Sequence, residues 1–485
     1  MIFSHKKLWV LLPILLAVIF ISTYKLTESP RTWYDDGLFM QVARNFAHFG
    51  VFGVQSSPGE LDESIAGYVT TGYSVTYPIG LVFKFFGVGL LQARIPMVVF
   101  ILLLLVVVFF LIYRLFGYKH AIVSTLLLAS FAPVYGNGKL VLGEVPGMFF
   151  LVLFLLLLNR IEEVSHKKIV PSILLGLVGG LVVVTKPIFI LLIPAVLICI
   201  WLRRKKINFT GNNIFFIGLF FLILVLLFFV TYFGEKDSVF GVLSFYGNNY
   251  SAGLGDILAA IPNNLERFFK ETTPGYFALT MLFWLCSYLL RIRKKQAIGL
   301  AENVAILFAI LIAIAYLKTP GWYRYLFPGQ VLALIFSPSA FSRVYDFVNN
   351  KLLRSAAPQF FWSIIFAVII AFQFYQIGFS SWVAGDYKST RSKELREYLG
   401  NLDKNKSIFV YEAAEAVTFL QSDNYYQFFH ITGDRYLGDR EFLTSGIPDE
   451  VIISSKSMNS GREFLKKYKL KTKLYRDLYF VFEKK

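Results

Sequence analysis

The sequence predicts an α-helical polytopic membrane protein of about eleven transmembrane helices, with interfacial helices in the first outer loop and a small C-terminal α/β extracytoplasmic domain. Of the 485 residues, 56% are apolar and only 16% are charged, whereas charged residues approach a quarter in soluble proteins. Charge is concentrated at the end of the chain: residues 386–485 hold 18 Lys and Arg and 15 Asp and Glu. A sparsely charged body followed by a soluble tail excludes a water-soluble enzyme.

The predicted spans are apolar stretches of roughly the 17 to 25 residues that a helix needs to cross the hydrocarbon layer. The first has a basic flank but no small-residue cleavage site after it, so we interpret it as a retained anchor rather than a signal peptide. The eleven stretches are residues 8–24, 95–113, 121–135, 141–158, 169–185, 187–202, 214–233, 275–290, 303–317, 325–341 and 360–380.

Orientation follows from the Lys and Arg residues of the short loops, which favour the cytoplasmic side. With the N-terminus cytoplasmic, the basic clusters at 114–119, 160–168, 203–206, 291–295 and 343–354 all fall inside. The break between the fifth and sixth spans at Lys186 is needed, because one merged span would move the 203–206 cluster outside. The location that follows is a cell membrane, inner or plasma, with several passes.

The opposite side receives two long outer loops, at about 26–92 and 234–274, and the C-terminal tail. We therefore predict a transmembrane domain over residues 1–383 and an extracytoplasmic α/β domain over residues 384–485. In the tail, helix-like stretches at 392–402, 412–421 and 461–468 mix with strand-like runs at 407–411, 450–454 and 478–482.

Composition also limits the partners. The net charge of +17 is placed mainly at the ends of apolar segments, so it indicates membrane orientation and no nucleic acid. Cys199 and Cys286 both lie in apolar runs and define no disulfide framework. No glycine-rich phosphate loop is present, which leaves an ATP-driven pump unsupported.

The predicted topology puts five charged residues at the outer face of the membrane, where ionisable groups are costly and usually functional. Asp35 and Asp36 open the first outer loop, just before an amphipathic stretch at 38–49. Glu144 starts the fourth span, Lys186 follows the fifth, and Arg324 precedes the tenth. The residues come from distant parts of the sequence but share one membrane face, which favours a site.

Each residue alone has a simpler explanation. The two aspartates can cap the helix that follows them. Glu144 can pair with the nearby Lys139, and the two cations can extend to the lipid headgroups. Together, however, the acids can act as a general base or hold a divalent metal, and the cations can bind a departing phosphate. This combination suits transfer from a lipid-linked phosphate donor within the bilayer.

The motifs around these residues resemble the GT-C superfamily of membrane glycosyltransferases, in particular the branch of protein O-mannosyltransferases and the bacterial lipid A aminoarabinose transferase. The resemblance lies in the acidic pair and the helix after it, and in four later segments: residues 72–87, Glu144, Thr185-Lys186-Pro187, and Tyr323-Arg324-Tyr325-Leu326-Phe327-Pro328. In two places the sequence departs from that pattern: Asp36 stands where Glu is common, and a lysine expected within 73–78 has no match.

The resemblance implies a polyprenyl-phosphate sugar donor, membrane lipid around it, and inversion at the sugar carbon. It implies Asp35 as the catalytic base, with Asp36 as its acidic neighbour. We expect Glu144 to orient the acceptor or bind a metal, and Lys186 and Arg324 to bind the donor lipid phosphate. The predicted enzyme is a hexosyl- or pentosyltransferase acting on a glycan, lipid or protein acceptor.

Two other function classes fit parts of the pattern. A lipid-linked saccharide transporter or flippase would need ionisable groups deep in its helices and two related halves, and neither is evident. An O-antigen polymerase or ligase usually has its principal outer loop late in the chain, whereas the acidic pair here follows the first span.

In the second long outer loop, Tyr246 and Tyr250 are candidates to close over the sugar.

Overall fold

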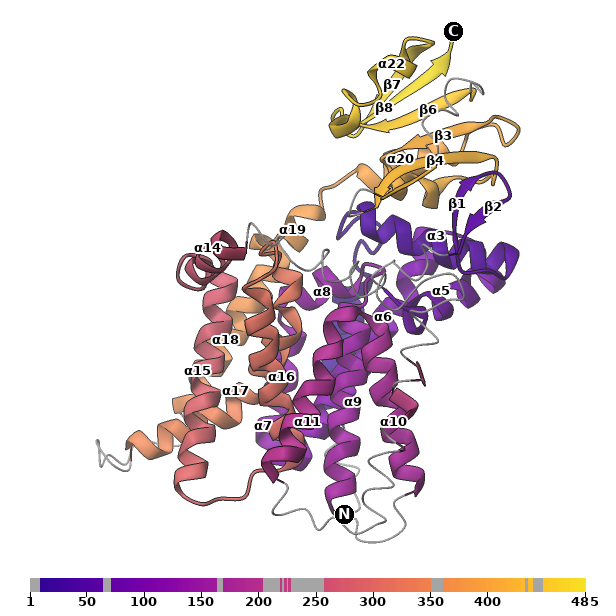
Figure 1. Ribbon diagram of the computed structural model, residues 1–485. Helices are drawn as coiled ribbons and strands as arrows, with labels where there is room; N and C mark the ends of the chain where they lie inside the picture. Colours follow the sequence, from indigo (N-terminus) through magenta and orange to yellow (C-terminus); the bar gives the residue numbers. More distant parts are fainter. Residues whose placement is uncertain are drawn as a thin grey trace.

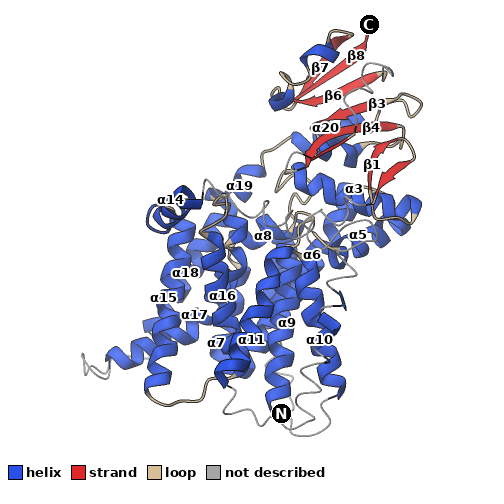
Figure 2. Ribbon diagram, viewed as in Figure 1, coloured by secondary structure: helices blue, strands red, loops and turns tan. Residues whose placement is uncertain are grey.

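The computed structural model describes residues 9–63, 71–163, 169–203, 257–349, 361–431, 435–438 and 448–485, together with six positions between 219 and 227. A bundle of long helices forms one part of the molecule, and all the strands lie beyond one end of it (Figure 2). The predicted fold class, a helical membrane protein with a small C-terminal α/β domain, is confirmed.

The bundle helices are largely apolar runs, and several of them end at a glycine with positive φ or at charged residues. For example, α6 ends at Phe116 because Gly117 takes a φ of +89°, which favours glycine. The bundle consists of α2 (Leu11–Thr23), α6 (Leu90–Phe116), α7 (Tyr118–Ala129), α8 (Ala132–Gly138), α9 (Glu144–Glu163), α10 (Ile169–Thr185), α11 (Leu192–Arg203), α15 (Thr272–Arg293), α16 (Leu300–Tyr316), α17 (Phe327–Val348) and α18 (Phe361–Tyr375).

Within the described residues, five helices are long and apolar enough to cross a membrane, or six if the bent pair α7 and α8 is one span. Four shorter apolar helices accompany them. Each predicted span except 214–233 coincides with one of these segments, and 214–233 lies largely outside the described residues. A multi-pass membrane protein is thus confirmed, whereas the number eleven stays a prediction.

The chain breaks at Lys186, as the charge pattern requires. Helix α10 ends at Thr185, Lys186 is extended with φ −159° and ψ 139°, and a 3₁₀ turn, η1 (Pro187–Leu191), leads into α11. Pro187 supports this break, because proline restricts the preceding residue to extended conformations.

The first outer loop folds into α3 (Tyr34–Phe49), the hairpin strands β1 (Val54–Ser57) and β2 (Glu60–Asp62), and α5 (Tyr73–Phe86). Helix α3 begins four residues before the stretch predicted from Leu38. Asp35 and Asp36 occupy its first turn, where carboxylates are favourable near the positive end of the helix dipole. The second long outer loop contains α14 (Ile257–Lys270), and its residues 234–256, with Tyr246 and Tyr250, lie outside the described residues.

The C-terminal part is a six-stranded mixed sheet in the order β5-β4-β3-β6-β8-β7. The central strand β3 runs parallel to β4 and to β6, and the other pairings are antiparallel. The elements of the C-terminal part are α19 (Trp382–Asp386), α20 (Arg391–Leu399), β3 (Ile408–Tyr411), η5 (Ala414–Phe419), β4 (Tyr425–Ile431), β5 (Arg435–Leu437), β6 (Glu450–Ser454), η6 (Ser455–Ser457), α22 (Arg462–Leu465), β7 (Tyr468–Leu474) and β8 (Tyr479–Lys484).

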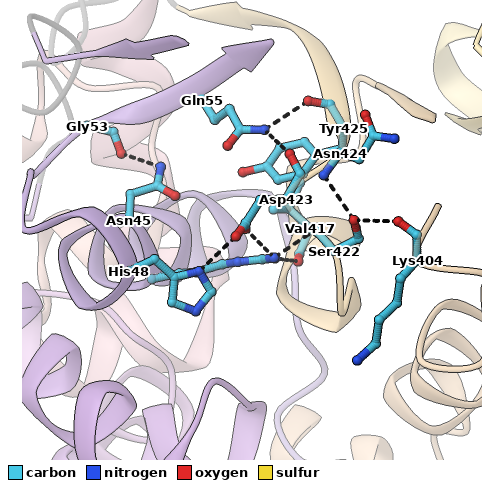
Figure 3. Close-up of polar contacts among 11 residues, drawn as sticks. Asn45, His48, Gly53, Gln55, Lys404, Val417, Ser422, Asp423, Asn424 and Tyr425 are labelled. Carbon is cyan, nitrogen blue, oxygen red and sulfur yellow. Dashed lines mark hydrogen bonds and ion pairs between the residues drawn. The ribbon is translucent and has the colours of Figure 1, made fainter. Parts of the chain in front are cut away.

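The sheet packs against the first outer loop, so that α3, β1 and the C-terminal part meet at one end of the bundle (Figure 1). Buried Arg44 of α3 donates to the carbonyl of Val417 at 2.8 Å and to Asp423 at 2.7 Å. Gln55 donates to the carbonyls of Asp423 and Tyr425, as Figure 3 shows. A domain boundary at 383/384 stays a prediction. In the structure, residues 34–62 of the first outer loop pack against the C-terminal part.

Gly37 lies where α3 touches the C-terminal part most closely. A Cβ at this position would overlap Glu415 Cα and would lie 2.5 Å from the Glu415 backbone nitrogen. Both atoms belong to the Glu415 backbone, so they can move only if the backbone of η5 shifts. We expect Gly37→Ala to destabilise the protein by about 1–3 kcal/mol, measured by thermal unfolding in detergent.

Gly385→Ala is the matched control for that substitution. Gly385 lies in α19, and a Cβ there would meet nothing within 4 Å. This variant should unfold at the temperature of the wild type. Equal stability of the two alanine variants would contradict the close contact between α3 and η5.

Candidate active site

Asp35 and Arg324 form an ion pair at the end of the bundle that faces the sheet. The Arg324 guanidinium lies 2.5 Å from a carboxylate oxygen of Asp35, although 289 positions separate them in the sequence. Asp35 is positioned by the first turn of α3, and Arg324 by the short 3₁₀ helix η2 (Tyr323–Tyr325) that precedes α17. The Asp35 side chain retains 25% exposure and that of Arg324 11%, so the carboxylate remains accessible.

Aromatic rings surround the Arg324 guanidinium. Its central carbon lies 4.7 Å from the ring centroid of Trp322, 5.2 Å from that of Trp33 and 5.4 Å from that of Tyr325. Planar guanidinium groups stack favourably on such faces. Burial opposes the charge of Arg324, but Asp35, Tyr325 and Glu144 together outweigh it and raise the pKa of the guanidinium. The group is a fixed cation.

Asp36 points elsewhere. It is fully buried, lies 3.3 Å from Arg94 of α6, and accepts a hydrogen bond from the backbone N–H of Val141 at 2.7 Å. Arg94 also donates to the carbonyl of Leu26. Burial raises the pKa of Asp36, while Arg94 lowers it. Asp36 thus ties the start of α3 to the bundle.

Glu144 and Lys186 form the second ion pair of the site. The Lys186 ammonium donates to Glu144 Oε1 at 2.5 Å, and both side chains are buried. The other carboxylate oxygen of Glu144 has no hydrogen-bond partner among the described residues. Helix α9 starts at Glu144 and α10 ends just before Lys186, so two helix ends position the pair.

The two ion pairs lie within electrostatic range of each other. Burial lowers the pKa of Lys186, Arg324 lowers it further, and Glu144 and Asp35 oppose that shift. Glu144 likewise raises the pKa of Arg324. Asp35, Glu144, Lys186 and Arg324 therefore form one cluster of alternating charge, which we call the charge cluster.

A cavity of about 780 Å³ adjoins the charge cluster. Arg324 and Trp33 line it from the bundle side, and residues of the C-terminal part, including Arg391 and Glu415, line the other wall. This volume lies within the range of small-ligand sites, roughly 300–1,000 Å³.

Lys139 does not pair with Glu144, which was the simpler explanation for that acid. Its ammonium instead donates to the backbone carbonyls of Tyr24 at 3.2 Å and Ser29 at 3.3 Å. Burial lowers the pKa of Lys139 to about 7. The helix-capping explanation for the aspartates is also incomplete, because both carboxylates have cation partners.

Several residues that shape this region were missed from the sequence. Trp33 lies two residues before the acidic pair and Trp322 directly precedes the late motif, so both could have been found as aromatic neighbours. Arg94, Arg391 and Glu415 carried no signal, because Arg94 is an isolated cation near the start of an apolar run and the other two lie in the soluble tail.

The described residues contain no group of three or more His, Cys, Asp or Glu side chains that could hold a metal ion. The carboxylates of Asp35 and Glu144 each face a cation instead. This donor set does not fit a divalent metal, and we derive no step through one.

The chain is similar to known membrane proteins over part or all of its length. A family model described as dolichyl-phosphate-mannose-protein mannosyltransferase matches residues 72–232. No curated protein matches the chain. ArnT from Cupriavidus metallidurans in the apo state matches with a TM-score of 0.68 at 13% identity, over 99% of this chain and 98% of that one.

Two further structures contain lipid phosphates. ArnT from Cupriavidus metallidurans bound to undecaprenyl phosphate matches with a TM-score of 0.64 at 12% identity, over 99% of this chain and 98% of that one. Archaeal oligosaccharyltransferase AglB from Archaeoglobus fulgidus, in complex with an inhibitory peptide and a dolichol-phosphate, matches with a TM-score of 0.59 at 12% identity. The match covers 95% of this chain and 71% of that one. The predicted resemblance to the GT-C superfamily is confirmed, and at these identities the structures show the shared fold.

Proposed function

We propose that this chain, which has the fold of the GT-C membrane glycosyltransferases, transfers a sugar from a polyprenyl-phosphate donor to an acceptor on the extracytoplasmic side of the cell membrane. One observation carries the proposal. A partly exposed carboxylate, Asp35, lies against the cation Arg324 and within electrostatic range of Lys186, at a single end of the helix bundle. A base and a phosphate site are thus adjacent.

The donor class is supported by the comparisons. The description of the matched family model names dolichyl-phosphate-mannose. Two structures of this fold contain undecaprenyl phosphate or dolichol-phosphate. The expected class, a polyprenyl-phosphate-dependent membrane glycosyltransferase, is supported by the family model over residues 72–232 and by the shared fold. The sugar, hexose or pentose, remains for experiment to identify.

Lys186 and Arg324 are the groups that would bind the donor phosphate. In the structure, each cation has a carboxylate partner. A lipid phosphate entering between them can replace Asp35 as the partner of Arg324, because phosphate oxygens accept charge-assisted hydrogen bonds from a guanidinium. Donor binding then releases Asp35 to act as a base.

The transfer step follows from that arrangement. Asp35 accepts the proton of the acceptor nucleophile, which forms a bond to the anomeric carbon as the bond from that carbon to the phosphate oxygen breaks. The leaving phosphate gains charge, which the two fixed cations stabilise. Attack from the face opposite the phosphate inverts the sugar carbon.

Asp36 and Glu144, the other two acids of the predicted site, fit positioning roles. Asp36 binds Arg94 and the Val141 N–H and has no exposed surface, so it fixes the start of α3 and hence Asp35. Glu144 holds Lys186. The extracytoplasmic location of this end, with the N-terminus cytoplasmic, is supported by the basic loops predicted for the opposite end.

Incubation of the purified protein with a panel of polyprenyl-phosphate sugars tests the function. We expect free polyprenyl phosphate to be released from at least one donor when a mixed cell-envelope extract supplies acceptors. A protein that binds polyprenyl phosphate and consumes none of the donors would contradict sugar transfer.

The affinity for polyprenyl phosphate should fall as pH rises. Burial lowers the pKa of Lys186, so the ammonium loses its proton at a lower pH than an ordinary lysine, whose value is about 10.4. The phosphate itself is fully ionised above pH 7.5, since its second pKa is about 6. Loss of the lysine charge therefore weakens binding on the alkaline side.

A titration of the dissociation constant from pH 7.5 to 10.5 measures this effect. Lys186→Arg is the control, because arginine keeps its charge throughout this range, and its profile should be flat. Parallel profiles for the two proteins would exclude Lys186 as a phosphate ligand.

A further inference from the structure

The cavity beside the charge cluster has one wall built by the C-terminal part of the chain. Glu412 follows β3, Ser454 ends β6, and Tyr479 starts β8; all three line the cavity. β3 and β6 are parallel neighbours at the centre of the sheet. The wall thus lies at the carboxyl ends of parallel strands, where open α/β sheets commonly bind their ligands.

Four buried polar atoms of residues that line this cavity have no hydrogen-bond partner among the described residues. They are Trp33 Nε1, Arg324 Nε, Arg391 Nε and Glu415 Oε2. A buried polar group without a partner costs about 1–3 kcal/mol. Three donors and one acceptor left unsatisfied around one cavity indicate a ligand that supplies both kinds of hydrogen bond.

Arg391 and Glu415 are held in place by each other. Their side chains form an ion pair, and the Tyr479 hydroxyl bridges them. Glu415 is 6% exposed. Burial raises its pKa, Arg391 lowers it, and Asp36 and Asp35 raise it further. The pair therefore lies within electrostatic range of Asp35.

The composition of the lining indicates the class of ligand. Six aromatic side chains face the cavity: Trp33, Tyr34, Trp322, Tyr323, Trp382 and Tyr479. The charged lining residues are mixed, with four cations against Asp386, Glu412 and Glu415. Neither positive nor negative charge dominates the lining, so the cavity would not attract a polyanion strongly. Aromatic faces with paired acids and bases suit a ligand that has both apolar faces and many hydroxyl groups.

We propose that the acceptor is a carbohydrate and that Arg391 and Glu415 of the C-terminal part bind its hydroxyl groups. The proposal rests on the proposed function for the sugar-transfer step. In this arrangement, Glu415 Oε2 accepts from one hydroxyl group, Arg391 Nε donates to another, and the aromatic side chains contact the sugar rings. The acceptor hydroxyl that reacts lies at Asp35.

The wall suits the acceptor rather than the donor. The donor arrives within the bilayer with its phosphate at Lys186 and Arg324. The strands of the C-terminal part, which contribute residues to the other wall of the cavity, lie beyond the bundle end (Figure 1). An extended peptide, the other acceptor class, commonly binds by adding a strand to a sheet edge. The edges here are β5 and β7, and the described lining includes no residue from either strand.

A binding experiment with the full-length protein in nanodiscs tests the proposal without any donor. The probes are a panel of soluble tetrasaccharides and, separately, a panel of twelve-residue Ser- and Thr-rich peptides; the signal is tryptophan fluorescence. We expect at least one tetrasaccharide to bind. Glu415→Gln and Arg391→Gln should each weaken that binding about tenfold or more.

Matched controls separate recognition from folding. Glu397→Gln and Arg396→Gln remove the same charges from exposed positions of α20 and should bind the tetrasaccharide like the wild type. Ser457→Trp narrows the cavity and leaves the Arg391–Glu415 pair intact, so it should also weaken binding. Thermal unfolding of every variant identifies any that fails to fold.

The outcomes distinguish this proposal from the function it rests on. With an active donor, the Arg391 and Glu415 variants should raise KM for the carbohydrate acceptor tenfold while KM for the donor stays within twofold. Binding of peptides alone, or tetrasaccharide binding that folded variants leave unchanged, overturns the carbohydrate proposal and leaves sugar transfer standing. Carbohydrate binding without release of lipid phosphate from any donor overturns the transferase and leaves the carbohydrate site standing.

Discussion

Asp35→Asn should reduce sugar transfer by about 10²- to 10⁴-fold, the usual contribution of a general base. The amide has the shape of the carboxylate but cannot accept the proton of the acceptor nucleophile. Affinity for polyprenyl phosphate should stay the same or increase, because Arg324 loses the anion that competes with phosphate for its guanidinium. Release of lipid phosphate measures the first effect, and a binding titration measures the second.

Asp403→Asn is the control for this experiment. Asp403 lies in an exposed turn, and its carboxylate accepts one hydrogen bond among the described contacts, from the nearby Asn405 backbone N–H. Its variant should transfer sugar at the wild-type rate. If Asp35→Asn retained normal turnover, Asp35 would not be the base, whatever the activity of the control.

Arg324→Gln should weaken binding of polyprenyl phosphate about 10- to 100-fold, since a hydrogen bond to a charged group contributes about 1.5–3 kcal/mol. Transfer should fall further, because the same cation stabilises the charge that grows on the leaving phosphate. Arg324→Lys should rescue little, because an ammonium can neither stack on Trp33 and Trp322 as a plane nor bind a phosphate with two parallel hydrogen bonds.

Arg343→Gln provides a control near the far end of α17, the helix that follows Arg324. Arg343 also lies against an aromatic ring, that of Phe116 at 4.7 Å, and is roughly 24 Å along α17 from the start of that helix at Phe327, at 1.5 Å per residue. Its removal should leave the affinity for polyprenyl phosphate unchanged. Equal losses in the two variants would indicate a general effect on the helix bundle and would contradict a phosphate site at Arg324.

Much of the helical part could be predicted from the sequence, because apolar length and loop charge are local properties. The break at Lys186 follows from the basic cluster at 203–206 and from Pro187. The structure shows the same break, with Lys186 in an extended conformation. The start of α3 was placed too late, since apolar spacing begins at Leu38 whereas the helix extends to the two aspartates that its dipole stabilises.

The sequence determined that ionisable residues gather at one membrane face, because span ends, acids and cations can be read residue by residue. Only the tertiary structure decided how they pair. Asp35 and Asp36 are adjacent in the chain, yet one faces Arg324 and the other Arg94. Successive residues of a helix point about 100° apart, and the elements packed on each side supply different partners. The same packing brings Glu415 of the C-terminal part against Gly37 and within electrostatic range of Asp35, a proximity that no local pattern encodes.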